Sequence, residues 1–156
     1  MIKFFYQKGI TLMEVLVVIA IIIILVTVAA PQFLKIRNTQ ILKGTGEDVM
    51  SLLAKARSQT MASLNSTEYG VHFASNQIVL FSGTVYNQNN ASNEIDTISS
   101  RATISNISLT GGAVDVYFNR LSGTASSTGT ITISISSDLS LAKTITISGT
   151  GGVSIN

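Results

Sequence analysis

The chain has 156 residues, of which 46% are hydrophobic and 6% aromatic, and a formal net charge of +2. This length allows one membrane segment and one small domain. Lys3 and Lys8 account for the charge excess, because residues 10–156 carry eight basic and eight acidic side chains. This balance disfavours a strongly basic nucleic-acid-binding surface. The absence of cysteine excludes disulfides and thiolate metal sites.

Residues 1–9 form a short leader that contains basic and aromatic residues. The 21 residues from Ile10 to Ala30 are apolar except for two threonines and Glu14. As a helix this segment spans roughly 30 Å, the thickness of the hydrocarbon core of a bilayer. Small residues at 26–30 keep an ordinary secretory signal open as an alternative.

Charge alone does not set the orientation of this segment, because basic residues lie on both sides of it. Lys3 and Lys8 precede it, and Lys35, Arg37 and Lys43 follow it. The short leader favours an N-terminus that stays in the cytoplasm.

The helical pattern continues beyond the apolar segment, with two expected weak points. Pro31 lacks an N–H and predicts a kink or local opening. The two glycines within 43–46 destabilise a helix, so we expect it to weaken there and then resume. An amphipathic stripe follows and predicts packing on a core, and it consists of Val49, Leu52, Leu53, Ala56, Thr60 and Leu64.

After residue 64 the hydrophobic period changes from that of a helix to that of a strand. Residues 69–73 and 77–81 predict a hairpin, and 82–100 predict a long polar loop. Further strands are expected at 101–109, 113–118, 130–135, 144–147 and 153–155. Isoleucine alternates with serine or threonine, which indicates an antiparallel sheet with one buried face and one wet face.

The predicted fold class is therefore α+β, with a long N-terminal helix packed on a C-terminal antiparallel β domain. The expected divisions are a leader at 1–9, a long helix at 10–64 that holds a transmembrane segment at 10–30, and a globular β domain at 65–156.

Glu14 is the strongest functional candidate among the individual residues. A carboxylate at the bilayer centre costs about 2.5–3.5 kcal/mol, although a position near the helix start lowers that cost. The alternative is an acid that is merely tolerated near a helix end. No catalytic constellation is present: His72 is the single histidine and predicts a structural or surface role, and the Glu94 and Asp96 pair is a weak cation candidate. We expect no cofactor, no metal and no enzymatic activity.

Residues 8–31 resemble the type IV pilin and type II secretion pseudopilin superfamily. Lys8-Gly9 followed by ITLMEV resembles the prepilin peptidase motif, in which a basic residue and glycine precede cleavage. Counted from Ile10, Glu14 occupies the fifth mature position, where the family has an acid. Pro31 occupies the twenty-second, where the family commonly has proline. Ile10 departs from the phenylalanine that is usual at the first mature position.

This resemblance implies a precursor that prepilin peptidase cleaves between Gly9 and Ile10, with N-methylation of Ile10. It implies that the new amine pairs with Glu14 of an adjacent subunit, and that Pro31 acts as a helix hinge. Implied partners are other pilin or pseudopilin subunits, an inner-membrane assembly platform, and membrane lipid before assembly. The implied location is the bacterial inner membrane, with a single pass and the globular domain outside the cytoplasm, followed by an extracytoplasmic filament.

A second resemblance, to the H-type minor pseudopilin group (GspH/FimT), covers the remainder. It rests on short motifs at Ala56-Arg57, 69–73 and 118–123, and on the closing Ile-x-Ile, Gly, Val-x-Ile pattern. It implies a structural, minor subunit of a pilus-like or pseudopilus filament. The alternatives are a DNA-uptake or adhesive minor pilin, and a secreted or anchored β domain that does not assemble.

Overall fold

A computed structural model describes residues 9–156 as one helix followed by two antiparallel sheets. The leader residues Lys3 and Lys8, and the expectations attached to them, lie outside the described residues. The chain divides into two compact units, the first ending at Arg37 and the second running from Asn38 to Asn156. The predicted fold class, a long N-terminal helix and a C-terminal antiparallel β domain, is confirmed.

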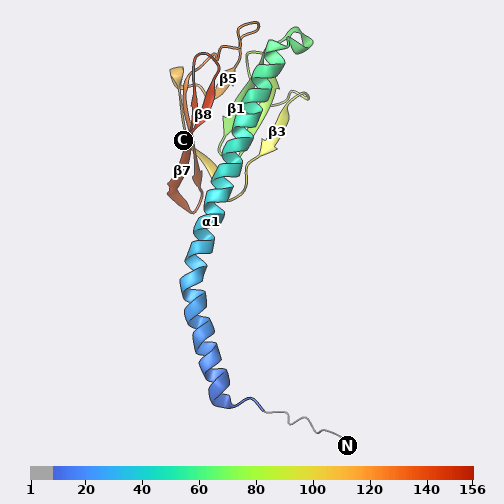
Figure 1. The fold of residues 1–156 in the computed structure, drawn as a ribbon. Helices are drawn as coiled ribbons and strands as arrows, with labels where there is room; N and C mark the ends of the chain where they lie inside the picture. Colours follow the sequence, from blue (N-terminus) through green and yellow to red (C-terminus); the bar gives the residue numbers. More distant parts are fainter. Residues whose placement is uncertain (1–8) are drawn as a thin grey trace, which may run out of the picture. The chain divides into compact units, whose positions relative to one another are not determined.

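Helix α1 runs from Leu12 to Met61 without interruption (Figure 1). In the first unit its apolar side chains are exposed, and an 18-residue window reaches a mean hydropathy of 3.1. It is the one helix among residues 9–156 that is long and apolar enough to cross a membrane. In the second unit α1 has a buried stripe of eight residues: Leu42, Thr45, Gly46, Val49, Leu52, Leu53, Ala56 and Thr60.

Three sequence expectations about this helix need correction. The two glycines within 43–46 do not weaken α1 enough to interrupt it. Pro31 also lies inside continuous helix, so the local opening expected there is absent, whereas the expected kink stays a prediction. The predicted stripe is confirmed from Val49 to Thr60 but is wrong at Leu64, which is 45% exposed in a short 3-10 helix, Leu64–Ser66. A helical period of hydrophobic residues shows which face of a helix is buried, but it does not show at which residue the helix stops contacting the sheet.

Gly46 is buried against the C-terminal strand, whereas Gly44 has open space around it. A Cβ at Gly46 would collide with the Cδ1 atom of Ile155, but a Cβ at Gly44 would meet nothing within 4 Å. Gly46 therefore provides close packing, and Gly44 only carries the conformational cost of glycine in a helix.

This contrast predicts opposite effects on stability. Gly46→Leu should lower the free energy of unfolding by about 1–3 kcal/mol because the site is already filled. Gly44→Ala should raise it by about 0.5–1 kcal/mol through helix propensity. Urea unfolding of the full chain in detergent micelles, followed by tyrosine near-UV circular dichroism, measures both. Gly44→Leu is the matched control, and a loss there equal to that of Gly46→Leu would contradict the packing role of Gly46.

The β domain has eight strands in two four-stranded sheets. The strands are β1 (Tyr69–Ala74), β2 (Gln77–Ser82), β3 (Glu94–Thr97), β4 (Ala102–Leu109), β5 (Asp115–Tyr117), β6 (Gly129–Ile135), β7 (Asp138–Ile147) and β8 (Val153–Ile155). The first sheet has the order β3-β2-β1-β5 and the second has the order β4-β6-β7-β8. Every pairing is antiparallel.

The predicted hairpin of β1 and β2 is confirmed, with Ala74 paired to Gln77 across its turn. Two other expectations are corrected. The stretch 82–100 is not all loop, because it contains the exposed edge strand β3, and the strands form two sheets rather than one. Alternation shows which face of a strand is buried, but not which strands pair.

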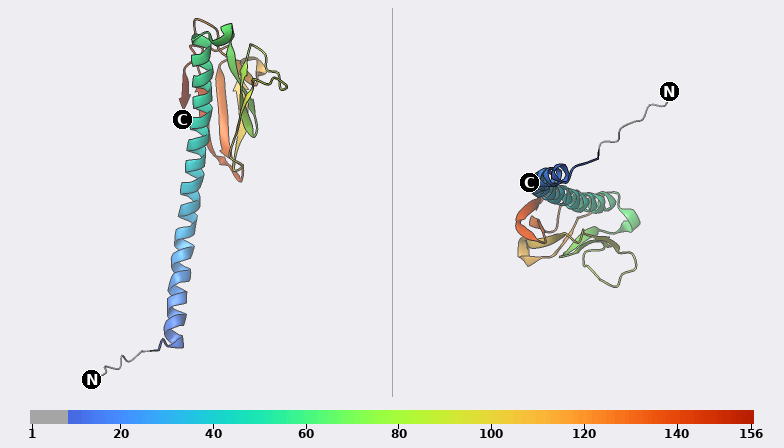
Figure 2. Two further views of the ribbon diagram at one scale, coloured as in Figure 1. Left: turned by 90° about the vertical axis from the view of Figure 1, so that its right-hand side faces the viewer. Right: turned by 90° about the horizontal axis from the view of Figure 1, so that it is seen from below.

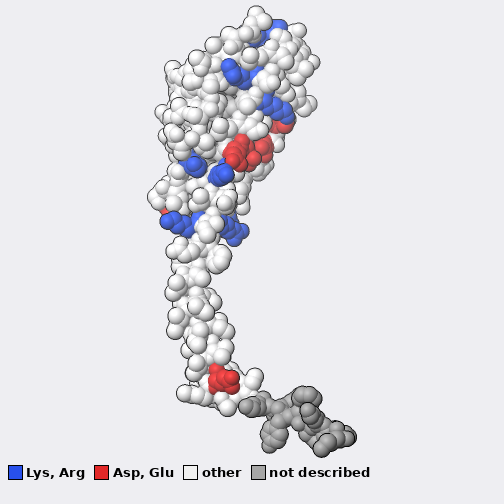
Figure 3. All heavy atoms as spheres, viewed as in Figure 1, with Lys and Arg blue, Asp and Glu red and all other residues white. Residues whose placement is uncertain are grey.

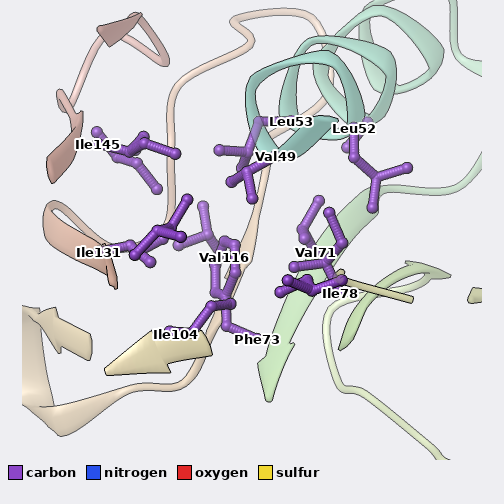
Figure 4. Close-up of a cluster of buried hydrophobic side chains, with 14 of the residues drawn as sticks. Val49, Leu52, Leu53, Val71, Phe73, Ile78, Ile104, Val116, Ile131 and Ile145 are labelled. Carbon is purple, nitrogen blue, oxygen red and sulfur yellow. The ribbon is translucent and has the colours of Figure 1, made fainter. Parts of the chain in front are cut away.

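The core lies between the second unit's part of α1 and the two sheets. Figure 4 shows Val49, Leu52 and Leu53 of the helix directed toward side chains such as Val71 and Ile131 of the sheets. Val49, Leu53, Val71 and Ile131 are fully buried. Figure 2 shows from two further directions how the second unit's part of α1 lies on the β domain. The helix and both sheets therefore share one core.

His72 has a structural role on the other face of the first sheet. Its Nδ1 pairs with an Asp115 carboxylate oxygen, and its ring stacks on Tyr86 with centroids 4.0 Å apart. Tyr86 also meets the edge of Phe81, and a Cβ at Gly70 would lie 2.6 Å from the Phe81 ring. These aromatic contacts hold the loop after β2 on the sheet.

Candidate assembly site at the start of the helix

The Gly9–Ile10 bond lies in exposed, non-helical chain, three residues before α1 begins. Gly9 has no neighbouring atom within 4 Å of the position a Cβ would take. Ile10 is 75% exposed. A protease needs an unobstructed backbone, and the step between these two residues is exposed and lies outside the helix.

Thr11 caps the helix at its N-terminus. The backbone N–H of Glu14 donates to Thr11 Oγ1 at 3.2 Å, and the N–H of Val15 donates to the Thr11 carbonyl at 3.2 Å. These bonds satisfy donors that a helix start otherwise leaves unpaired. This cap is not among the sequence predictions above, although Thr-x-x-Glu is the pattern of a capping box. The cap explains why α1 begins at Leu12 and leaves Ile10 outside.

The Glu14 side chain is exposed in the first turn of α1 and has no hydrogen-bond or ion-pair partner among the described residues. An acid there is favoured by the positive end of the helix dipole. On the face shown in Figure 3, the acid near the helix start is followed by a long uncharged stretch. Glu14 is therefore a carboxylate on an otherwise apolar surface and is free to accept a cation from outside the chain.

The other polar side chain in this stretch is satisfied within the helix. Thr27 Oγ1 lies 2.9 Å from the Ile23 carbonyl oxygen and 2.8 Å from that of Ile24, and it donates its proton to this pair of acceptors. Pro31, four residues later, provides no N–H for the Thr27 carbonyl. Bonding of a threonine hydroxyl back to the preceding turn slightly destabilises a helix and often bends it. Thr27 and Pro31 thus weaken adjacent turns of the same helix.

Three of the short motifs noted in the sequence, Ala56-Arg57, 118–123 and the closing pattern, meet at Arg57. Arg57 Nε donates to the Gly123 carbonyl at 3.0 Å, and Nη2 donates to the Thr150 carbonyl at 3.2 Å. Gly151 has a φ of +77°, and a Cβ there would collide with the Gly123 carbonyl oxygen. Arg57 therefore joins α1 to two loops that appear in the sequence only as separate motifs.

Glu94, one of the two acids of the weak cation candidate, has a cationic partner within the chain. Glu94 pairs with Lys55 Nζ at 2.6 Å, and no group of three or more potential metal ligands occurs within residues 9–156. Partial burial, Asp96 and Glu47, in that order, raise the pKa of Asp48 above its ordinary value. The negative charge of Asp48 is thus less favourable in the folded state than in the unfolded state.

Because the pKa of Asp48 is raised, removing the charge of this side chain should increase the free energy of unfolding by an amount that depends on pH. The folded state binds the proton of the Asp48 carboxyl more tightly than the unfolded state does. The stabilisation that this proton contributes is therefore complete below pH 3.8 and is lost as pH rises through the pKa of the folded state. Asp48→Asn should match the wild type in acid and exceed it at neutral pH by about 0.5 kcal/mol or less, because the side chain is exposed. Urea unfolding in micelles as a function of pH measures this gap. Asp96→Asn should give part of the same gain, and a gap that shrinks with rising pH would contradict the assignment.

The comparisons with known proteins agree with both parts of the molecule. A family model for the prokaryotic N-terminal methylation motif matches residues 5–30, and the model for the type II transport protein GspH matches residues 45–151. No curated protein sequence matches the chain.

Among solved structures, the minor pseudopilin EpsH from the type 2 secretion system of Vibrio cholerae has a similar fold. The TM-score is 0.54 at 14% identity, and the match covers 74% of this chain and 95% of that one. The GspH match extends over more than half of the chain and includes Arg57 and both loops that it joins. The chain therefore belongs to the GspH family of type II transport proteins and is a pseudopilin with an N-terminal methylation motif.

Proposed function

We propose that this pseudopilin is made as a precursor, cleaved between Gly9 and Ile10, and assembled by α1 as a minor subunit of a type II secretion pseudopilus. The observation that carries the proposal is the Glu14 carboxylate, which has no partner within residues 9–156 and lies on an exposed apolar helix. Cleavage creates a cationic amine on Ile10, and this amine is the partner that Glu14 of a neighbouring subunit takes. Exclusion of water strengthens that attraction.

The family and the fold are those of structural pseudopilins, so we propose a non-enzymatic role. The exposed apolar helix first lies in lipid and is later covered by neighbouring helices. We propose a single pass through the inner membrane with the β domain outside the cytoplasm. The partners are then prepilin peptidase, other pseudopilins and an inner-membrane assembly platform.

Two further roles follow for residues of the helix and its start. N-methylation falls on the Ile10 amine that cleavage exposes. Pro31 acts as a hinge. Thr27 supports this hinge because its hydroxyl stays bonded to the Ile23 carbonyl oxygen when the backbone hydrogen bond to that carbonyl opens. The hinge is therefore proposed as a point of reversible opening within a continuous helix.

N-terminal sequencing of the mature chain tests the processing step. The expected first residue is a methylated Ile10, and Gly9→Leu should leave the precursor uncleaved because the peptidase needs a small residue there. Gly44→Leu, a substitution of the same type far from the junction, should be cleaved normally. A mature chain that begins near Pro31 would instead mean ordinary secretion.

No observation favours DNA binding over this role. Beyond the helix the basic residues are Arg101, Arg120 and Lys143. The Arg120 guanidinium donates to the Ser66 carbonyl at 2.9 Å, which engages it within the fold. Neither an adhesive role nor secretion without assembly explains the exposed Glu14 carboxylate.

A further inference from the structure

A groove of about 390 Å³ runs along the second unit's part of α1, beside the turn that leads into β8. It is lined by Met50, Ala54, Arg57, Ser58, Met61, Gly151, Gly152 and Val153. The helical residues recur at three- and four-residue spacing, so they form one face of α1. No acidic side chain lines the groove.

One wall of the groove is an open strand edge. β8 is the last strand of its sheet. The Ser148 N–H donates to the Gly152 carbonyl, and Thr144 and Asn156 exchange both backbone bonds. Because backbone groups alternate along an antiparallel strand, those of Val153 and Ile155 point away from β7. Within residues 9–156 they have no strand to pair with.

Two of the three other sheet edges, those of β3 and β4, are protected, and the β8 edge is not. The β3 edge carries Glu94 and Asp96, and charged side chains discourage strand pairing. β4 has a register shift between Ile104 and Asn106, and its Ile104 N–H donates to the Ser75 carbonyl. The β8 edge has neither a charged side chain nor a bulge.

The chemistry of this groove selects its occupant. Unpaired N–H and C=O groups in a row are satisfied by another extended backbone, whereas a lipid chain offers no donor or acceptor. Met50 and Met61 provide an adaptable apolar wall for the side chains of such a segment. The groove also runs along the helix through which the subunit is proposed to assemble, so neighbouring subunits lie within reach.

We propose that this groove binds an extended, apolar segment of a neighbouring pseudopilin, which adds to β8 as a further strand. The proposal rests on the proposed function in that the donor is a subunit of the same filament. Backbone pairing to Val153 and Ile155 provides affinity, and the methionine-lined helix face selects apolar side chains. Gly46 contributes indirectly, because its lack of a Cβ lets Ile155 and thus β8 lie close to α1.

Amide hydrogen exchange tests the added strand directly. The full-length chain is measured alone in micelles and after assembly with the pseudopilins of its own system. The amides of Val153 and Ile155 should exchange about tenfold or more slowly in the assembly. The Ser154 amide, on the β7 side, should change little. Exchange that is unchanged at Val153 and Ile155 in assembled filaments overturns the proposal.

Substitutions in the groove test its occupancy. Ala54→Arg and Ala54→Glu should both remove the protection, because either side chain fills the groove regardless of its charge. Ser51→Arg is the control, since Ser51 is exposed on α1 but does not line the groove. Opposite effects of the two Ala54 substitutions would indicate charge recognition and overturn strand addition.

Cross-linking identifies the occupant. The chain has no cysteine, so Ala54→Cys carries a unique benzophenone probe and Ser51→Cys is its control. Attachment to one segment of another pseudopilin supports the proposal, whereas attachment to lipid or to a second copy of this chain overturns it. A wild-type chain that never enters filaments would instead contradict the proposed function.

Discussion

Glu14→Ala should reduce incorporation of this pseudopilin into filaments by two orders of magnitude or more. The substitution removes the acceptor for the Ile10 amine of the next subunit and leaves that amine unpaired in an apolar interior. Breaking a buried pair in this way costs about 3–5 kcal/mol, and each 1.4 kcal/mol corresponds to a factor of ten. Quantitative immunoblotting of sheared filaments against the membrane fraction measures the effect.

Glu14→Gln separates charge from size in this experiment. Glutamine keeps the length of the side chain and the backbone N–H that donates to Thr11 Oγ1, but it cannot neutralise an amine. It should therefore fail almost as completely as alanine, while the precursor still inserts in the membrane. Wild-type incorporation of either variant would show that apolar packing alone assembles the subunit.

Phe118→Ala should lower the free energy of unfolding by about 3–5 kcal/mol, a range typical of emptied aromatic sites. Phe118 is fully buried, and its N–H donates to the Tyr69 carbonyl at 3.0 Å. The free energy of unfolding of natural domains is only about 5–15 kcal/mol. Much of the variant β domain should therefore unfold or be degraded. Urea unfolding in micelles and the steady-state amount of protein measure this loss.

Leu121→Ala is the control for this substitution. Leu121 lies three residues further along the same loop but is 88% exposed, so its truncation should change stability by no more than about 0.5 kcal/mol. Equal losses at both positions would place the effect in the loop backbone rather than in the buried ring.

The sequence predicted the features that depend on local pattern. The apolar helix, the buried stripe from Val49 to Thr60 and the hairpin of β1 and β2 all follow from period and turn chemistry. The Thr11 cap could also have been predicted, because its signal lies within four residues. These features needed no knowledge of distant contacts.

The features that were missed depend on contacts between distant residues. Gly46 looked like a helix breaker because its partner, Ile155, is more than a hundred residues away. Strand β3 lies where the sequence predicts a loop, because its four residues are all exposed and no apolar face marks them. The meeting of three motifs at Arg57 likewise required the fold. Periodicity reveals which face is buried but not what buries it.

The Arg57 contacts constrain the order in which the domain can fold. Its two carbonyl acceptors lie 66 and 93 residues further along the chain, and the second precedes β8 by only a few residues. Folds built on such distant contacts form slowly, because the chain must lose the entropy of closing large loops before the stabilising contacts can form. The helix start can insert while the β domain is still being made, but the domain closes only after its last residues emerge. In the proposed topology this delay keeps the β domain unfolded, and hence able to thread, until it has crossed the membrane.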